Sequence, residues 1–322
     1  MKPLAAIGEC MIELSEHPDG RLTRAFGGDT LNTAVYLARL GMPVDYITAL
    51  GDDPWSDAML SAWQAEGVGT GMVIRSKGRL PGLYIIQTDA GGERRFSYWR
   101  DQAPARDLFS LPETGSLCVA LARFGHIYLS GISLSLYGPN GRAVLFEALA
   151  DAQKAGSKIV FDTNFRPRGW PDREAAMAAY ARLLQLADVV FASLEDLSLL
   201  FGADGERMLD PHWQRAEIVL KLDYPACRIG CEGEMVEIAA EAVPTVVDTT
   251  AAGDSFAAAY LAARLSGYAP ATAARAGHIL ARAVVQHRGA IIPRDAWPSA
   301  ALSALGLKTG MTGTGMTGDV AT

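Results

Sequence analysis

Short hydrophobic runs alternate along the chain with longer segments in which hydrophobic residues recur every three or four positions. The runs have the length of buried strands, and they include residues 4–10, 44–50, 127–129, 158–162, 188–192 and 218–222. The longer segments have the spacing of helices, and they include residues 30–41, 57–66, 141–155, 175–187, 194–202 and 271–286. Strands that alternate with helices in this way form a mainly parallel sheet with helices on both faces. The sequence therefore predicts an α/β fold.

The pattern changes near residue 72, where short extended runs separated by glycines replace the alternation. These runs cover residues 72–75, 80–88 and 94–99, a spacing that is typical of β-hairpins. We therefore expect a small β-sheet lid, formed by about residues 11–27 and 71–102. Some of its polar side chains could contact an acidic ligand, or they could lie on a half-solvated sheet; they are Arg79, Tyr84, Tyr98 and Arg100.

The domain organisation follows from where the alternation stops. The 322 residues are enough to bury a substantial core, and we expect residues 1–304 to form one unit that includes the lid. From Thr309 the chain repeats Gly-Met-Thr-Gly, which is a low-complexity pattern. The segment 305–322 is therefore predicted to be a disordered tail.

Composition excludes several classes of partner. The formal net charge of -7 argues against nucleic acid or an anionic membrane as the main partner. No hydrophobic run approaches the roughly 18 residues of a membrane span. The N-terminus turns polar too early for a signal peptide, and the four cysteines lack the spacing of a zinc site. We expect a cytoplasmic protein with free thiols, in which an anionic ligand needs a local basic cluster.

The clearest sign of chemistry is a turn of small residues at 248–254, which leads into an alanine-rich segment. Ala251, Ala252 and Gly253 carry almost no side chain, so their backbone N–H groups can approach a ligand closely. Such groups at the start of a helix bind anions, and Asp254 then lies beside the anion. This combination suits phosphoryl transfer, with Asp254 taking a proton from the attacking hydroxyl. The alternative is an aspartate that only stabilises the helix dipole.

Two further loops carry polar residues at positions where ligands bind. The glycine–glycine–aspartate at 27–29 precedes a predicted helix, so it either contacts a ligand or forms a turn capped by the aspartate. Asn164, Arg166 and Arg168 follow the predicted strand at 158–162, and ligands of parallel sheets gather at the carboxyl ends of strands. The arginines indicate a site for a carboxylate or phosphate, with surface salt bridges as the alternative.

These motifs carry a resemblance to a known family. The segment Asp248-Thr249-Thr250-Ala251-Ala252-Gly253-Asp254-Ser255-Phe256 resembles the C-terminal signature of the ribokinase (phosphofructokinase-B) family of sugar kinases. The segment Gly27-Gly28-Asp29-Thr30-Leu31-Asn32 is similar to that family's sugar-binding glycine motif. Within the family, four stretches resemble the 2-keto-3-deoxygluconate kinases, namely residues 8–14, 79–84, 98–100 and 288–294. The resemblance covers about the first 300 residues and implies a ribokinase-like fold.

The resemblance implies an ATP-dependent kinase that phosphorylates the terminal primary hydroxyl of 2-keto-3-deoxygluconate, with Mg²⁺ bridging the phosphates. The catalytic groups that it implies are Asp254 and the N–H groups of Ala251, Ala252 and Gly253. The residues implied to hold the sugar acid are Gly27, Gly28, Asp29, Asn32, Tyr84, Tyr98, Arg100 and Arg166. Those implied to contact the nucleotide and its magnesium are Asn164, Ser193, Asp196, Lys221, Thr249 and Gly253. Asp248 and Thr250 are implied to form a monovalent cation (K⁺) site.

The chain departs from the family pattern at two places. Relatives carry Asn-x-x-Glu where this chain has Ser193 and Asp196, and the shorter acid can still bind the water shell of magnesium. Relatives read Lys-x-Gly in the nucleotide loop, where this chain has Lys221, Asp223 and Pro225. Asp223 adds like charge near the phosphates and Pro225 removes an N–H donor, which predicts an altered ATP affinity or a re-routed loop.

Three functions remain open at this point. A kinase of 2-keto-3-deoxygluconate is favoured if Arg100 and Arg166 converge in one pocket, because a neutral sugar does not need two arginines. Scattered arginines favour a related kinase, such as a fructokinase. The altered loop is the only support for a non-catalytic sugar-acid sensor, and the intact Asp254 turn argues against it. An open lid face also predicts a possible homo-oligomer.

Overall fold

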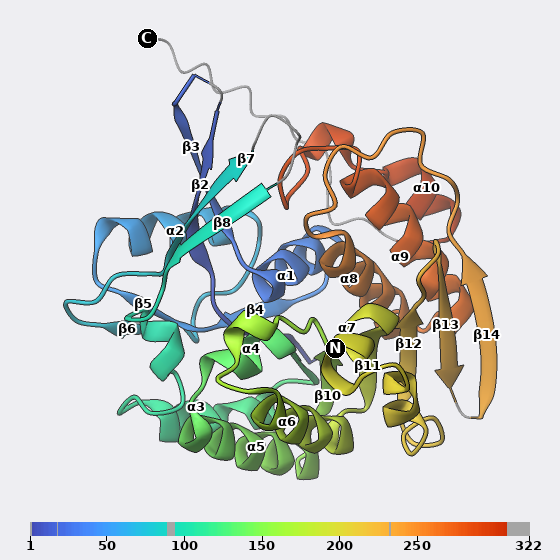
Figure 1. Ribbon diagram of the computed structural model, residues 1–322, viewed down its shortest axis with the longest axis horizontal. Helices are drawn as coiled ribbons and strands as arrows, with labels where there is room; N and C mark the ends of the chain where they lie inside the picture. The colour runs from blue at the N-terminus through green and yellow to red at the C-terminus, as the bar shows by residue number, and fades with distance from the viewer. Residues whose placement is uncertain (1, 18, 89–93, 232, 308–322) are drawn as a thin grey trace.

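An eight-stranded sheet runs through the computed structural model, which describes residues 2–17, 19–88, 94–231 and 233–307 (Figure 1). In sheet order the strands are β14 (Glu234–Ala239), β13 (Ala226–Cys231), β12 (Glu217–Lys221), β11 (Val189–Ser193), β10 (Lys158–Asp162), β9 (His126–Ser130), β1 (Leu4–Ile7) and β4 (Val44–Ile47). The strands from β4 to β12 pair in parallel, and β13 and β14 extend the sheet as antiparallel strands. The predicted, mainly parallel central sheet is confirmed.

Helices pack on both faces of this sheet. One face carries α1 (Asp29–Arg39), α2 (Pro54–Ala65), α8 (Ala252–Leu265), α9 (Pro270–Val284) and α10 (Ser299–Ala304). The other face carries α3 (Thr114–Ala120), α4 (Gly131–Leu136), α5 (Pro139–Lys154), α6 (Arg173–Leu186) and α7 (Leu194–Phe201). Two hydrophobic cores result, because successive strand residues point to opposite faces.

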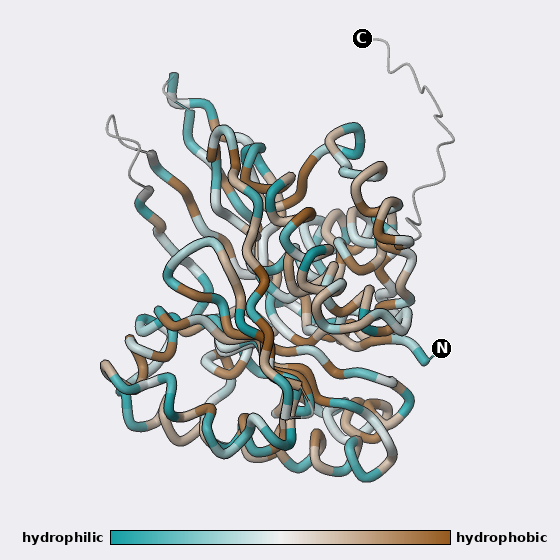
Figure 2. Tube along the Cα trace, turned by 90° about the vertical axis from the view of Figure 1, so that its right-hand side faces the viewer, coloured by the Kyte–Doolittle hydropathy of each residue, from teal (hydrophilic) through white to brown (hydrophobic). Residues whose placement is uncertain are grey.

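Strand β1 shows this division directly. Leu4 and Ala6 belong to the core under α1 and α8, whereas Ala5 and Ile7 belong to the core under α5 and α6. Both sets are at most 2% exposed, so the strand is apolar at every position. Hydrophobic colour accordingly runs through the middle of the molecule, where the strands of the large sheet lie (Figure 2). Because helices cover both faces of such a strand, its sequence does not alternate between polar and hydrophobic residues.

A second, four-stranded sheet projects from the body, and we call it the β-lid (Figure 1). In sheet order its strands are β3 (Leu22–Gly27), β2 (Met11–Glu16), β7 (Leu83–Thr88) and β8 (Arg94–Trp99). The hairpins β2–β3 and β7–β8 join through a parallel pairing of β2 with β7. Its strands thus come from within both segments that the sequence assigned to a lid.

The expected extent of the lid was wrong at residues 72–75. Strand β6 (Ile74–Ser76) pairs instead with β5 (Ala49–Gly51) in a separate two-stranded sheet. The hydrophobic run at 44–50 is therefore two strands, β4 and β5, and the amide of Ile74 donates to the carbonyl of Thr48 between them at 3.0 Å. A hydrophobic pattern alone does not show which partner an extended segment takes.

Several short elements were not predicted, because six or seven residues are too few to show a helical period. They are α3, α4 and α10, together with the 3-10 turns η1 (Pro104–Asp107), η2 (Leu121–Arg123), η3 (Pro167–Gly169), η4 (Gly205–Leu209) and η5 (Arg294–Ala296). Leu307 is buried in the core, beyond the boundary expected at residue 304. The rest of the predicted tail, 308–322, lies outside the described residues. None of the helices in the described ranges has the length and hydrophobicity needed to cross a bilayer.

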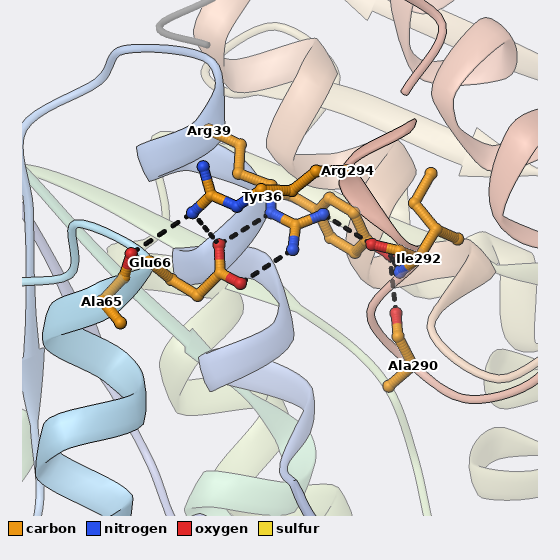
Figure 3. Close-up of polar contacts among 7 residues, drawn as sticks. All are labelled: Tyr36, Arg39, Ala65, Glu66, Ala290, Ile292 and Arg294. Atoms are coloured by element: carbon orange, nitrogen blue, oxygen red, sulfur yellow. Dashed lines mark hydrogen bonds and ion pairs between the residues drawn. The ribbon is translucent and has the colours of Figure 1, made fainter. Parts of the chain in front are cut away.

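The segment that follows α9 is fixed to α1 by buried polar contacts (Figure 3). Arg39, whose side chain is 4% exposed, donates to both carboxylate oxygens of Glu66 and, at 2.7 Å, to the carbonyl of Ile292. The hydroxyl of Tyr36 donates to the carbonyl of Ala290 at 2.7 Å. This anchor holds the loop before η5 close to the start of α8, where the candidate site lies.

Candidate active site

The turn before α8 is shaped by Asp248 and by a left-handed residue. Asp248 accepts the amides of Thr250 and Gly289, both at 2.9 Å, one on each carboxylate oxygen. Ala251 precedes the helix with φ 59°, a conformation that a side chain makes unfavourable. The amide of Ala252 donates back to the carbonyl of Thr249 at 3.2 Å. The amide of Ala252 is therefore engaged within the turn, and those of Gly253 and Asp254 lie at the helix start, where they can face an anion.

Asp254 lies in the first turn of α8 with only 8% of its surface exposed. Its Oδ2 accepts a hydrogen bond of 2.9 Å from the side-chain amide of Asn32 on α1. Burial raises the pKa of Asp254 to about 8, and the charges of Asp29 and Asp162 add to the rise. A carboxyl group with a pKa near working pH is suited to accept a proton from a hydroxyl.

Lys221, the last residue of β12, brings a cation to the same place. A Cβ atom on Gly253 would lie 3.1 Å from its Nζ, so the glycine leaves room for the ammonium group. The charge of Lys221 lowers the pKa of both Asp162 and Asp254. The two N–H groups of α8 and this ammonium together form a site for an anion.

Asp162, at the carboxyl end of β10, is a buried acid to which the sequence assigned no role of its own. It is 2% exposed, and its Oδ1 has no hydrogen-bond partner among the described residues. Burial raises its pKa to about 6, Lys221 opposes the rise, and the neighbouring charges of Asp196 and Asp29 add to it. Its position at a strand end, where ligands of such sheets bind, was the available signal.

The side chains around Asp162 allow a test of whether magnesium fits. Within the described ranges, no group of three or more acidic, histidine or cysteine side chains is arranged to enclose a metal ion. The orphaned oxygen of Asp162 and the carboxylate of Asp196 nevertheless provide two hard oxygen donors in one region. Mg²⁺ bound through substrate phosphates and water needs only one or two carboxylates, so the residues fit such an ion.

Asp196 and its neighbours connect the two loops that follow β10 and β11. Ser193 caps α7 by accepting the amide of Asp196 at 3.0 Å. Asp196 in turn accepts the hydroxyl of Thr163 at 2.8 Å and lies 3.5 Å from a guanidinium nitrogen of Arg166. Ser193 thus caps α7, and its hydroxyl orients the start of this helix. Asp196 is the acidic member of the Ser193–Asp196 pair.

Asn164 and Asp29 contact each other across the site. The side-chain amide of Asn164 donates to Asp29 Oδ2 at 2.8 Å, and Asn164 adopts a positive φ of 27°. The sequence placed Asn164 with the nucleotide, whereas this contact ties it to the glycine motif on the sugar side. The pair joins the end of β10 to the start of α1.

The inner face of the β-lid carries the two predicted tyrosines. Tyr84 and Tyr98 are direct cross-strand partners with ring centroids 5.7 Å apart. Tyr84 donates to the carboxylate of Glu13, which lies opposite it on β2. A Cβ atom on Gly27 would lie 2.1 Å from the Tyr84 hydroxyl, so this close approach requires glycine. Gly27 therefore acts by letting the lid tyrosine reach the site.

The charges of the predicted arginines act on Tyr98. The guanidinium of Arg100 lies 5.9 Å from the centroid of the Tyr98 ring. Burial raises the pKa of the Tyr98 hydroxyl, and the charges of Arg100, Arg166 and Arg168 all lower it. Three cationic groups thus act on one phenol, which makes this part of the site favourable for a carboxylate.

Comparisons with known proteins agree with this geometry. The family described as pfkB family carbohydrate kinase matches residues 1–297. The chain belongs to the pfkB family of carbohydrate kinases. It is a phosphotransferase with an alcohol group as acceptor.

Named relatives of this pfkB kinase cover nearly the whole chain. It is 44% identical to the 2-dehydro-3-deoxygluconokinase of Escherichia coli (strain K12), over 92% of this chain and 99% of that protein. It is 45% identical to the enzyme of the same name from Dickeya dadantii (strain 3937), again over 92% and 99%. The solved fructokinase with bound ATP from Xylella fastidiosa superposes with a TM-score of 0.79 at 26% identity, covering 94% of this chain and 98% of that one.

The altered nucleotide loop of this pfkB kinase is an exposed hairpin turn between β12 and β13. Asp223 and Pro225 are exposed, and Tyr224 is 51% exposed with its hydroxyl donating to Glu237 at 2.8 Å. Lys221 alone points back toward α8. The departure from the family pattern therefore lies in the turn and leaves the ammonium beside Gly253 in place.

Proposed function

We propose that this pfkB kinase transfers the γ-phosphoryl group of ATP to the terminal primary hydroxyl of 2-keto-3-deoxygluconate, giving the 6-phosphate. The observation that carries the proposal is that the charges of Arg100, Arg166 and Arg168 all act on the Tyr98 hydroxyl. A neutral sugar has no group that uses these charges, whereas the sugar acid has a carboxylate. The two relatives at 44% and 45% identity carry the corresponding name.

The proposed mechanism gives Asp254 the role of base. Asn32 holds its Oδ2 at 2.9 Å, and we assign Oδ1 to the sugar hydroxyl. The N–H groups of Gly253 and Asp254 and the ammonium of Lys221 would stabilise the charge on the transferring phosphoryl. Ala251 and Ala252 contribute the shape of the turn, because the amide of Ala252 is bonded to Thr249.

The carboxylates near Lys221 support a requirement for Mg²⁺. Asp29, Asp162, Asp196 and Asp254 act on one another electrostatically, and a polyphosphate would be repelled by them. Bound magnesium would bridge the phosphates and neutralise this charge. Asp162 and Asp196 are the residues that we expect to hold its water shell.

Three further features belong to the proposal. Asp248 and Thr250 would take part in a K⁺ site, and the protein would act in the cytoplasm. The β-lid would pair two copies of the chain, because a hollow of about 660 Å³ lies along it. Ile12, Leu14 and Leu83 line the hollow, and Trp99 on its rim is 60% exposed.

The proposed function is tested with purified protein, ATP and Mg²⁺ against a panel of 2-keto-3-deoxygluconate, gluconate, fructose and ribose. We expect ADP release with the keto-deoxy acid at a kcat/KM at least tenfold above that of the other sugars, and ³¹P NMR should identify a primary phosphate ester. A preference for fructose would contradict the sugar-acid assignment. Absence of turnover with every sugar would favour the sensor.

A further inference from the structure

Glu9 is a buried acid that the proposed reaction does not use. It follows β1, is 4% exposed, and forms an ion pair with the guanidinium of Arg100, which follows β8. Burial raises the pKa of Glu9, and the charge of Arg100 is the main opposing influence. Both residues lie where the chain passes between the large sheet and the β-lid.

The other two passages between sheet and lid also meet Glu9. A Cβ atom on Gly28, which follows β3, would lie 2.2 Å from the Glu9 carbonyl oxygen. A Cβ atom on Gly82, which precedes β7, would lie 2.8 Å from Glu9 Oε1. The amide of Ile12 on β2 donates to the Gly82 carbonyl at 2.8 Å. Glu9, in the first crossing, is therefore closely approached by the crossings at Gly28 and Gly82, and its carboxylate is paired with Arg100 of the fourth.

Arg100 is only partly used by this contact. A guanidinium has five N–H donors in one plane, and Glu9 engages Nη2. The Nε of Arg100 is buried without a hydrogen-bond partner among the described residues, as is Glu9 Oε1. The same guanidinium lies by the ring of Tyr98, on the inner face of the β-lid. One edge is thus fixed by Glu9 while other donors remain for a ligand.

We propose that Glu9 is a positioning residue that orients the Arg100 guanidinium for the carboxylate of the sugar acid. The inference rests on the proposed function. Glu9 itself carries the wrong charge to bind the substrate carboxylate, so its effect on the sugar must pass through Arg100. Arg166 and Arg168 supply the positive charge that remains after Glu9 has neutralised Arg100.

The test is a double-mutant cycle with E9A, R100A and E9A/R100A, read as KM for 2-keto-3-deoxygluconate. We expect E9A to raise this KM roughly 10- to 100-fold, the range for one hydrogen bond to a charged group, with kcat and the KM for ATP within about threefold of wild type. Because Glu9 acts through Arg100, the double variant should have the same KM as R100A. If the KM increase of the double variant equals the product of the increases of E9A and R100A, the inference is overturned.

Two further variants separate positioning from folding. E9Q keeps an acceptor oxygen at the same reach and should restore most of the affinity that E9A loses. If E9A does not fold, E9D replaces it in the cycle, because the shorter side chain withdraws the carboxylate from Arg100 while keeping its charge. D107N is the matched control, since Asp107 pairs with Arg79 at 3.0 Å near the same crossing and should leave the sugar KM unchanged.

The outcomes distinguish this inference from the proposed function. Wild-type protein that does not phosphorylate 2-keto-3-deoxygluconate overturns both. Wild-type protein that does so, combined with an E9A variant of normal sugar KM, overturns only the role of Glu9. Equal loss of activity toward the sugar acid and toward a slowly used neutral sugar in E9A would also reject it, because a purely structural defect affects both.

Discussion

The two ends of the site carry opposite charge. On the sugar side, the charges of Arg100, Arg166 and Arg168 act on Tyr98, and Glu9 pairs with Arg100. On the phosphate side lie three aspartates, Asp162, Asp196 and Asp254, with Lys221 as the nearby cation, and the charge of Asp29 in the glycine motif acts on two of them. Both substrates are anions, yet the protein receives them by different means. The sugar carboxylate can meet protein cations directly, whereas the triphosphate needs a metal ion to offset the aspartates.

This difference in charge also separates the residues that select the sugar from those that carry out phosphoryl transfer. Guanidinium groups in fixed positions discriminate a carboxylate by geometry as well as charge. A cluster of buried acids supports proton transfer and metal binding, but it does not distinguish one sugar from another. Changes on the sugar side should therefore alter KM for the sugar, and changes on the phosphate side should alter kcat or the use of ATP.

The largest effect is expected for Asp254→Asn at the boundary between the two sides. Loss of the base should lower kcat by about 10²–10⁴, while sugar KM stays close to wild type because the amide fills the same space. Thermal stability should not fall, because the buried carboxylate that is removed has a raised pKa and opposes folding. Steady-state kinetics measures kcat and the sugar KM, and thermal unfolding measures the stability. D204N, at an exposed i,i+3 pair with Arg207, is the control. Turnover near that of wild type would remove Asp254 from the mechanism.

Lys221→Met should act on the phosphate side alone. We expect kcat/KM for ATP to fall about 10- to 100-fold, as for a lost charged hydrogen bond, with sugar KM little changed.

In the wild type, kcat/KM should rise with pH up to about 8, the pKa of Asp254, and then level off. Because Lys221 lowers that pKa, the variant's rising limb should move to higher pH. The surface variant K154M is the control. A rising limb of the pH profile that stays at the same pH in K221M would contradict the coupling between Lys221 and Asp254.

Asp162→Asn should make the unliganded protein more stable and the enzyme less active at a given Mg²⁺ concentration. The folded pKa of about 6 exceeds the ordinary value of 3.8, so the ionised carboxylate opposes folding at neutral pH. Removing it should raise the free energy of unfolding by about 1–3 kcal/mol and increase the Mg²⁺ concentration needed for activity. The gain should shrink as pH falls through 6, because the folded wild type then takes up a proton. A variant less stable than wild type at pH 8 would show that Asp162 is not a destabilising charge.

The smallest effect is expected for Ala251→Gly, which changes backbone preference and no charge. Glycine removes the cost of a side chain at φ 59°, worth about 1 kcal/mol, so the melting temperature should rise by a few degrees. Thermal unfolding of A251G beside A259G measures this. Ala259 lies inside α8, where glycine should destabilise instead.

The sequence predicted the sheet, the helices of more than about ten residues and the Asp254 turn, because each depends on a local pattern. It did not predict that residues 74–76 pair with β5, since strand partners depend on distant parts of the chain. Asp162 and Glu9 were missed for a related reason. An isolated acid in a sequence looks the same whether it is solvated or buried, and only packing reveals an orphaned oxygen or an ion pair with Arg100.

The way the β-lid is assembled has a consequence for folding. Its two hairpins are separated in the chain by α1, β4, β5, α2 and β6, and within the described residues they join through the parallel pairing of β2 with β7. Pairings between distant segments form slowly because loop closure precedes any gain from contact. We therefore expect each hairpin to form before the two join, so that a refolding chain recovers sugar recognition only after this late pairing.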